Sequence, residues 1–230
     1  RWRLVGRRRL VRRRRRLGAL VMKNAAARLR PEEHVEIAAA ITAAERETSG
    51  EIFVVVAAES ADYRMLALLW SALAALAGGF VSAAITPQIA AGSLAIGQAG
   101  VFALLAAASL VPTLRLYFVP RAVRTARASA RAREQFLAHN LHATAARTGV
   151  LIYVSLAEHH AEIVADSGIN DRAPPGFWQD IIDRLTTEIA AGRLANGLTG
   201  AVAACGTALR DHFPRHPGDE NELPDRVVEI

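Results

Sequence analysis

The stretch Met65-Leu-Ala-Leu-Leu-Trp70 opens a run of fifty residues, ending at Leu114, that contains no charged side chain. Thr86-Pro87-Gln88 interrupts the run near its middle and leaves two apolar segments of roughly 20 residues each. A helix rises about 1.5 Å per residue, so each segment would be about 30 Å long, the thickness of the hydrocarbon core of a bilayer. The sequence therefore predicts a transmembrane helical hairpin over residues 65–112, with its turn at Pro87.

The distribution of charge argues against a nucleic-acid partner. The chain has 28 basic and 22 acidic residues and a formal net charge of +6. Ten of the arginines lie within the first 16 residues, so the rest of the chain carries 18 basic and 22 acidic side chains, a net charge of −4. A nucleic-acid-binding domain needs a basic face with aromatic or groove-entering elements, and this mildly acidic body shows no such pattern.

Residues 1–30 form a basic arm that has two interpretations. It could be a polybasic segment attracted to anionic lipid, at about 1 kcal/mol per arginine near the surface. It could also be non-native sequence, because the chain does not begin with Met and Met22 would make an ordinary start. It is not a secretory signal, because no apolar segment of useful length follows the arginines.

Basic residues flank the predicted hairpin at both of its ends but are absent from its turn. Arg64 precedes the first apolar segment, and six arginines follow the second: Arg115, Arg121, Arg124, Arg127, Arg131 and Arg133. The positive-inside rule then places both flanks in the cytoplasm. We expect a multi-pass protein of the bacterial inner (plasma) membrane, with membrane lipid as a partner and with cytoplasmic N- and C-termini.

Three β-branched runs predict a short mixed sheet on either side of the hairpin. Residues 51–57 form a buried strand that is apolar on both faces, and residues 150–154 form a second. A third runs from about Ala161 to Ala165, and the short break before it predicts antiparallel pairing with the second. The first strand is separated from the second by long helices, which favours parallel pairing of those two.

Helical periodicity accounts for most of the remaining chain. A helix should begin at Pro31 and end near Gly50, and a long one should begin at Pro120 and reach about Ala146. Two amphipathic helices follow, over residues 178–189 and 198–209, and Cys205 lies on the apolar side of the second as an inert core thiol. Residues 214–230 form an acidic tail that we expect to be loosely ordered.

The order of these pieces resembles a TPM domain. Thr48-Ser-Gly-Glu-Ile-Phe-Val-Val-Val resembles its opening, and Gly149-Val-Leu-Ile-Tyr-Val and Ala161-Glu-Ile-Val-Ala-Asp-Ser-Gly-Ile-Asn resemble its second half. The resemblance spans roughly residues 34 to 213 and is closest to the bacterial inner-membrane branch, in which a hairpin stands between the first two strands. It implies a layered α/β/α domain with a short mixed sheet, divided here into residues 31–64 and 113–213.

The resemblance also implies a chemistry, because soluble relatives are associated with divalent-cation binding, such as Ca²⁺, and with weak acid-phosphatase activity. Those relatives usually carry an acidic residue and Asn before the Gly-Val-Leu strand, where this chain has Arg147-Thr148. A positive charge at that position opposes cation binding.

Candidate metal ligands follow two of the predicted strands. Glu59 and Asp62 come after the first, and Asp166, Asn170 and Asp171 come after the third. Carboxylate and amide oxygens suit a hard cation, so Asp62, Asp166, Asn170 and Asp171 are the predicted ligand set. If the third strand is antiparallel, however, its end lies at the opposite edge of the sheet, and the set is split.

Other polar or small residues carry less chemistry. His139 and His142, and the adjacent pair His159 and His160, match no familiar zinc spacing and are interpreted as exposed helix and turn residues. Two ladders of small residues in the hairpin, Ala74-Gly78-Ser82 and Ser93-Gly97, should let its helices pack closely.

The sequence favours one function over a second. The first is a non-catalytic, membrane-tethered module that binds an unknown protein partner or a ligand near the bilayer, because no complete catalytic constellation is present. The second is a weak divalent-cation-dependent phosphatase, suggested by the resemblance and the loop carboxylates.

Overall fold

The computed structural model describes residues 29–144, 147–170, 174, 176–215 and 223–230. The chain divides into two compact units. The α/β unit contains the chain up to Ser60 together with Arg127–Ile230, and the hairpin unit is Ala61–Ala126. Residues 1–28 of the basic arm and Asp171 lie outside the described residues.

A four-stranded sheet forms the centre of the α/β unit. Its strands are β1 (Glu51–Ala57), β2 (Gly149–Ser155), β3 (His160–Ala165) and β4 (Val227–Glu229). Their order in the sheet is β3-β2-β1-β4. β1 pairs in parallel with both β2 and β4, whereas β2 pairs antiparallel with β3. The predicted mixed sheet and the directions of its first three strands are therefore confirmed.

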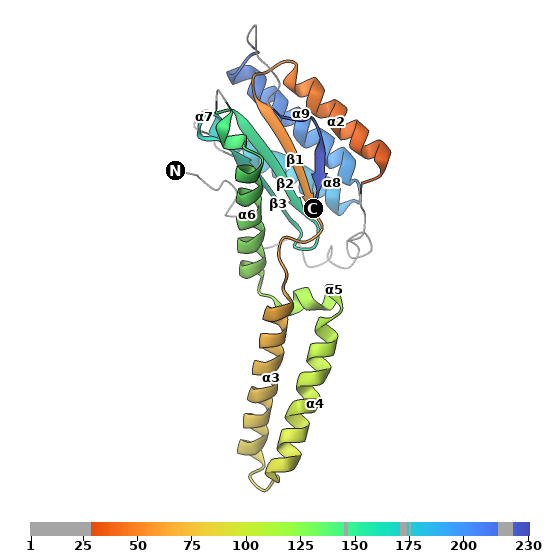
Figure 1. Ribbon diagram of the computed structural model, residues 1–230, viewed down its shortest axis with the longest axis vertical. Coiled ribbons are helices and arrows are strands. Elements are labelled where there is room, and N and C mark those ends of the chain that lie inside the picture. The colour runs from red at the N-terminus through yellow and green to blue at the C-terminus, as the bar shows by residue number, and fades with distance from the viewer. Residues whose placement is uncertain (1–28, 145–146, 171–173, 175, 216–222) are drawn as a thin grey trace. The chain divides into compact units, whose positions relative to one another are not determined.

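Helices cover both faces of this sheet, so the unit has the predicted α/β/α layers. One face packs against α2 (Pro31–Glu45), α8 (Phe177–Ala190) and α9 (Leu194–His212). The other face packs against α6 (Arg121–Ala138), whose Ala132 and Phe136 lie in one apolar cluster with alternate residues of β1 and β2. Figure 1 shows α2 and α9 together on one side of the strands. Every residue of β1 and β2 is buried as a result, which explains their continuous apolar sequences.

The end of α6 differs from the prediction. The helix ends at Ala138 and not near Ala146, because Asn140 adopts a left-handed conformation with φ of 55°. Asn tolerates this conformation better than most residues. A single 3-10 turn, η2 (Leu141–Ala143), then leads toward β2.

The acidic tail is also more ordered than predicted over its last residues. Val227 and Val228 of β4 pair with Val54 and Val55 of β1, and Ile230 exchanges backbone hydrogen bonds with Ala58 and Val56 at 2.8 and 3.0 Å. The cause is the edge of β1, whose backbone N–H and C=O groups need partners. A short Val-Val pair within an otherwise polar segment is sufficient to supply them.

The hairpin unit consists mainly of two antiparallel helices, visible as a pair in Figure 1. α3 (Arg64–Ile85) and α4 (Ala91–Ser109) are connected by a turn that contains Pro87, as predicted. α5 (Pro112–Arg115) and the 3-10 turn η1 (Leu116–Phe118) follow. By length and composition alone, both α3 and α4 could cross a membrane.

The residues through which α3 packs were predicted incorrectly. The buried ladder of α3 is Ala67, Ser71, Ala75 and Gly79, one position removed from the predicted Ala74-Gly78-Ser82. Gly78 and Gly97 have no neighbouring atom close enough to contact an added Cβ. In an alanine-rich helix, small residues recur at four-residue spacing on several faces, so the pattern alone does not select the face in contact.

Candidate functional site

Four buried polar side chains meet where the parallel strands β1 and β2 end. The carboxyl ends of parallel strands lie at the same edge of a sheet, which is where ligands of α/β proteins usually bind. Tyr153 and Ser155 come from the last part of β2, while Ser60 and Glu158 come from the segments that follow β1 and β2. We call these four residues the Ser60 cluster.

Hydrogen bonds connect all members of the Ser60 cluster. The Ser60 hydroxyl lies 2.8 Å from the Tyr153 phenol and donates to the Ser155 hydroxyl at 2.8 Å. The Glu158 carboxylate accepts from the Ser60 backbone N–H at 2.9 Å and from the Ser155 hydroxyl. Burial raises the pKa of Tyr153, and its hydrogen bond with Ser60 only partly opposes this shift, so the phenol stays neutral at physiological pH. The cluster holds the chain at Ser60, shortly before α3 begins.

A second polar group lies beside this cluster on the α6 face of the sheet. Glu162 accepts a hydrogen bond from Ser129 of α6 at 2.5 Å and lies 2.9 Å from the Nε2 of His160. Burial by itself would raise the pKa of Glu162, but the hydrogen bonds from His160 and Ser129 outweigh it, and the net shift is downward. In the sheet register, His160 is opposite Ser155, and Glu162 is opposite Tyr153.

The other histidines differ in how well they fit the prediction of exposed residues. His142 and His159 are exposed, as predicted. His160 is only half-exposed because it contacts Glu162. The ring of His139 packs against Phe53 of β1, with 4.3 Å between ring centroids. Within the described residues, no three His, Cys, Asp or Glu side chains are arranged to hold a metal.

The structure brings together two of the four predicted metal ligands. Asp166 immediately precedes α7 (Ser167–Asn170), and its backbone carbonyl accepts a hydrogen bond from the Asn170 N–H at 2.9 Å. The Oδ1 of Asp166 accepts from the Ser167 N–H at 2.5 Å. Its Oδ2 is buried and has no hydrogen-bond partner among the described residues. These two residues therefore offer oxygens of the kind that a hard cation prefers.

Asp62 belongs to the hairpin unit and has cationic neighbours. Its carboxylate accepts from the Arg64 backbone N–H at 2.9 Å and lies 3.8 Å from the Arg115 guanidinium. Guanidinium groups compete with a metal ion for the same oxygens. Asp62 is therefore a poor candidate for a cation ligand.

The antiparallel direction of β3 has the predicted consequence for the other acidic residues. Asp166 donates its backbone N–H to Gly149 O at 3.0 Å, at the start of β2. Glu59 follows β1, whose end pairs with the end of β2 at Ser155. Glu59 and Asp166 therefore lie at opposite edges of the sheet.

A further buried carboxyl group lies at the edge of the sheet where β1 begins. Glu45, the last residue of α2, accepts the Ile52 backbone N–H at 2.8 Å. Burial, with smaller contributions from the neighbouring carboxylates Glu51 and Asp225, raises the pKa of Glu45 to about 9. Asp225 accepts a hydrogen bond from Thr42 of α2 at 2.6 Å. Glu45 is therefore protonated at neutral pH and occupies the junction of α2, β1 and the segment before β4.

The sequence does not predict most of these polar residues. Tyr153 and Ser155 belong to a strand interpreted as wholly apolar, and Glu162 lies inside another strand. One signal was available, because a carboxylate in the middle of a buried strand needs a partner to offset the cost of its burial. The partner of Glu162 on α6, Ser129, has no comparable signal.

Comparisons with known proteins support the α/β fold described above. The family model of the TPM domain matches residues 112–208. The NMR structure of the BA42 protein from the psychrophilic bacterium Bizionia argentinensis is similar, with a TM-score of 0.56 and 22% sequence identity over 89% of this chain and 97% of that one. At this identity the similarity supports the fold alone. No curated protein matches the chain.

Proposed function

We propose that this chain, whose residues 112–208 match the family model of the TPM domain, is an integral protein of the bacterial inner membrane, and that its cytoplasmic TPM-like domain is a non-catalytic binding or assembly module. The observation that carries this proposal is the exposure of large apolar side chains along α3 and α4. Membrane lipid would cover these side chains, and an unknown protein would be the partner of the α/β unit.

The apolar side chains on the hairpin are too exposed for an aqueous surface. Phe80, Ile96 and Leu104 have 78%, 76% and 70% of their surface exposed, and many of their neighbours are similar. Transfer of one large apolar side chain out of water is favourable by about 1.5–3 kcal/mol. Soluble proteins rarely expose so large an apolar patch. α3 and α4 have 22 and 19 residues, and so are about 30 Å long. A bilayer matches both their length and their surface.

The arginines around the hairpin support its proposed orientation. Arg64 begins α3, Arg115 ends α5, and Arg121 begins α6, whereas the turn around Pro87 carries no charged residue. Positively charged flanks favour the cytoplasmic side. The N- and C-terminal parts of the chain would then share the cytoplasm, as they must if β1 and β2 are to pair.

Alkaline extraction and cysteine labelling test the membrane proposal. The full chain should stay in bacterial membranes after a carbonate wash. A membrane-impermeant maleimide applied to intact spheroplasts should label Gln88→Cys in the turn but not Thr207→Cys on α9, and permeabilisation should make both react. Native Cys205 is buried, so the unaltered chain serves as the unlabelled control. Release by carbonate, or the opposite labelling pattern, would contradict the proposal.

The Ser60 cluster supports a non-catalytic role. Each of its hydroxyl and carboxylate groups is bonded to another member, and this arrangement stabilises the sheet edge. We therefore assign the cluster a structural role, which is to fix the chain at Ser60 within the α/β unit.

One observation favours a second candidate function, a weak divalent-cation-dependent phosphatase. The buried Oδ2 of Asp166 has no hydrogen-bond partner in the described part of the chain, and a cation such as Ca²⁺ would provide one. Calorimetric titration of Ca²⁺, Mg²⁺ and Mn²⁺ into the detergent-solubilised chain, with a parallel phosphate-release assay, tests this candidate. Saturable binding and phosphate release should be lost in Asp166→Ala and kept in Asp183→Ala, which removes an exposed acid of α8. Absence of binding up to millimolar cation would eliminate the candidate.

A further inference from the structure

Gln98 differs from three serines of the hairpin, whose hydroxyls are hydrogen-bonded within their own helices. The hydroxyls of Ser71, Ser82 and Ser109 each donate to a carbonyl of their own helix, at 2.8, 2.9 and 2.7 Å. The side-chain amide of Gln98 makes no hydrogen bond to any described residue. It carries two N–H donors and a carbonyl acceptor, so the need for partners is larger than for a hydroxyl.

Gln98 lies well inside the part of α4 that would occupy the bilayer. It follows the start of α4 by about 10 Å along the helix axis, in a hydrocarbon core about 30 Å thick. Ester carbonyls and headgroups of lipids lie outside that core, and acyl chains have no hydrogen-bonding groups. Neither water nor lipid can therefore form hydrogen bonds with the amide at this depth. An unsatisfied polar group there costs several kcal/mol.

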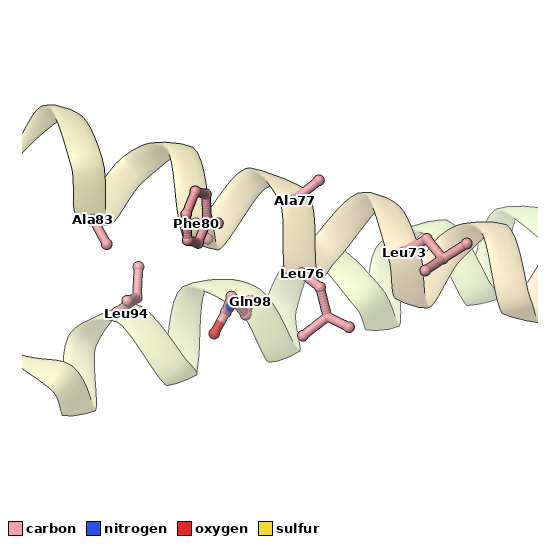
Figure 2. A pocket seen from close by; sticks show the side chains of 8 residues that line it. Leu73, Leu76, Ala77, Phe80, Ala83, Leu94 and Gln98 are labelled. Atoms are coloured by element: carbon pink, nitrogen blue, oxygen red, sulfur yellow. The ribbon is translucent and has the colours of Figure 1, made fainter.

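The packing between α3 and α4 holds the amide at an open apolar groove. A Cβ atom built on Gly79 of α3 would overlap the amide of Gln98, so the glycine is what allows Gln98 to lie between the helices. The groove has a volume of about 630 Å³ and is otherwise lined by apolar residues such as Leu76 and Phe80. Figure 2 shows Leu94 and Gln98 on α4 and Phe80 on α3 lining it from two sides. Gln98 is half-buried, so its amide remains reachable from the lipid side.

The side of α4 that carries Gln98 permits close approach by another helix. Ala91 and Ala95 precede Gln98 by seven and three residues and lie on the same side of the helix, and the larger Phe102 follows it by four at one end of this side. All three side chains are exposed. Small residues beside a polar one are typical of interfaces between membrane helices, where backbones approach closely enough for hydrogen bonds across the interface.

We propose that two copies of this chain associate in the membrane through this side of α4, with the Gln98 amides of the two copies hydrogen-bonded to each other. A carboxamide is its own complement, because it can donate and accept at once, and a twofold axis lets the two amides exchange bonds. A second copy thus supplies the missing partner that lipid cannot. This inference rests on the proposal that α3 and α4 span the membrane.

The first test measures association in phosphatidylcholine–phosphatidylglycerol vesicles that contain the full chain. Donor- and acceptor-labelled copies carry their dyes on Gln88→Cys in the turn, and energy transfer is followed as the protein-to-lipid ratio falls. Gln98→Leu should weaken association by about threefold to twentyfold, the range measured for single hydrogen bonds between membrane helices. Ser82→Ala removes a hydroxyl that is bonded within its own helix, and should leave association unchanged. Equal association of Gln98→Leu and the unaltered chain would overturn the inference.

A second test locates the contact without altering Gln98. Oxidation of Ala95→Cys in the same vesicles should yield a disulfide-linked dimer, whereas Gly100→Cys, on the opposite side of α4, should not cross-link. Cross-linking at Gly100→Cys alone would overturn the inference. Vesicle flotation separates the two proposals: protein that fails to float contradicts both, and protein that floats as a monomer contradicts only the pairing of Gln98.

Discussion

The hydroxyl of Ser60 lies 2.8 Å from the phenolic oxygen of Tyr153, although the two residues are 93 positions apart in the sequence. The whole hairpin unit is inserted between them. This contact, together with the bonds to Ser155 and Glu158, closes the α/β unit at the point where the chain leaves for α3. Its loss should therefore be measurable as a loss of stability.

Removing the Ser60 hydroxyl should destabilise the α/β unit. Ser60→Ala leaves the buried Tyr153 and Ser155 hydroxyls short of a partner, which costs about 1–3 kcal/mol. Urea unfolding of the detergent-solubilised chain should show a lower midpoint with an unchanged slope. Thr207→Ala, which removes an exposed hydroxyl bonded within α9, should change the midpoint little. A midpoint for Ser60→Ala equal to that of Thr207→Ala would mean that the cluster contributes no stability.

Glu162 should make stability fall in acid. Its folded-state pKa lies below the ordinary value of 4.5, so its carboxylate stabilises the fold above that value, and the contribution is lost as the pH falls through the lower folded pKa. The unfolding temperature should therefore fall less steeply between pH 7 and acid pH for Glu162→Gln than for the unaltered chain. Parallel curves for the two proteins would show that the His160 and Ser129 contacts do not favour the ionised form.

Glu45 should have the opposite effect over a different pH range. Its pKa is about 9 in the folded state and 4.5 ordinarily, so the folded chain holds a proton that the unfolded chain has released between these values. Stability from this group is complete below pH 4.5 and is lost as the pH rises toward 9. Glu45→Gln should flatten the decline in unfolding temperature over that range. An unaltered slope would show that the carboxyl group ionises normally in the folded protein.

Cys205 should be chemically silent in the folded chain. It is fully buried, and burial raises its pKa to about 12, so almost no thiolate forms at neutral pH. Mass spectrometry should find no N-ethylmaleimide adduct after incubation at pH 7, and complete modification in denaturant. Rapid modification of the native protein would mean that α9 separates readily from the sheet.

Much of the fold could be predicted because its strongest signals are local. The run of β-branched residues in β1 predicts a strand, and the helical spacing of apolar residues in α8 and α9 predicts two amphipathic helices. Neither prediction depends on the rest of the chain. β4 has only three residues, and what creates it is an edge of β1 far away in sequence. The end of α6 depends on a single residue, Asn140, whose left-handed conformation is permitted but not required by its sequence.

The candidate site was harder to predict because its members are defined by contacts across the sheet. Ser60 and Glu158 are ordinary loop residues in sequence, and they become a cluster only when β1 and β2 align in parallel. For the candidate metal ligands, the sequence predicted that an antiparallel β3 would separate the residues after the third strand from those after the first. The register was needed to show that Asp166 lies beside Gly149 and away from Glu59.

The parallel pairing of β1 with β2 also has a consequence for the order of events during synthesis. Glu51 pairs with Gly149, so β1 leaves the ribosome long before its central partner exists and cannot complete the sheet by itself. The hairpin has emerged in full by the time β2 is made. If α3 and α4 span a membrane as proposed, the core of the α/β unit closes only after these helices have reached the lipid. A chain whose hairpin stalled during insertion would then expose an unfinished sheet to chaperones and proteases.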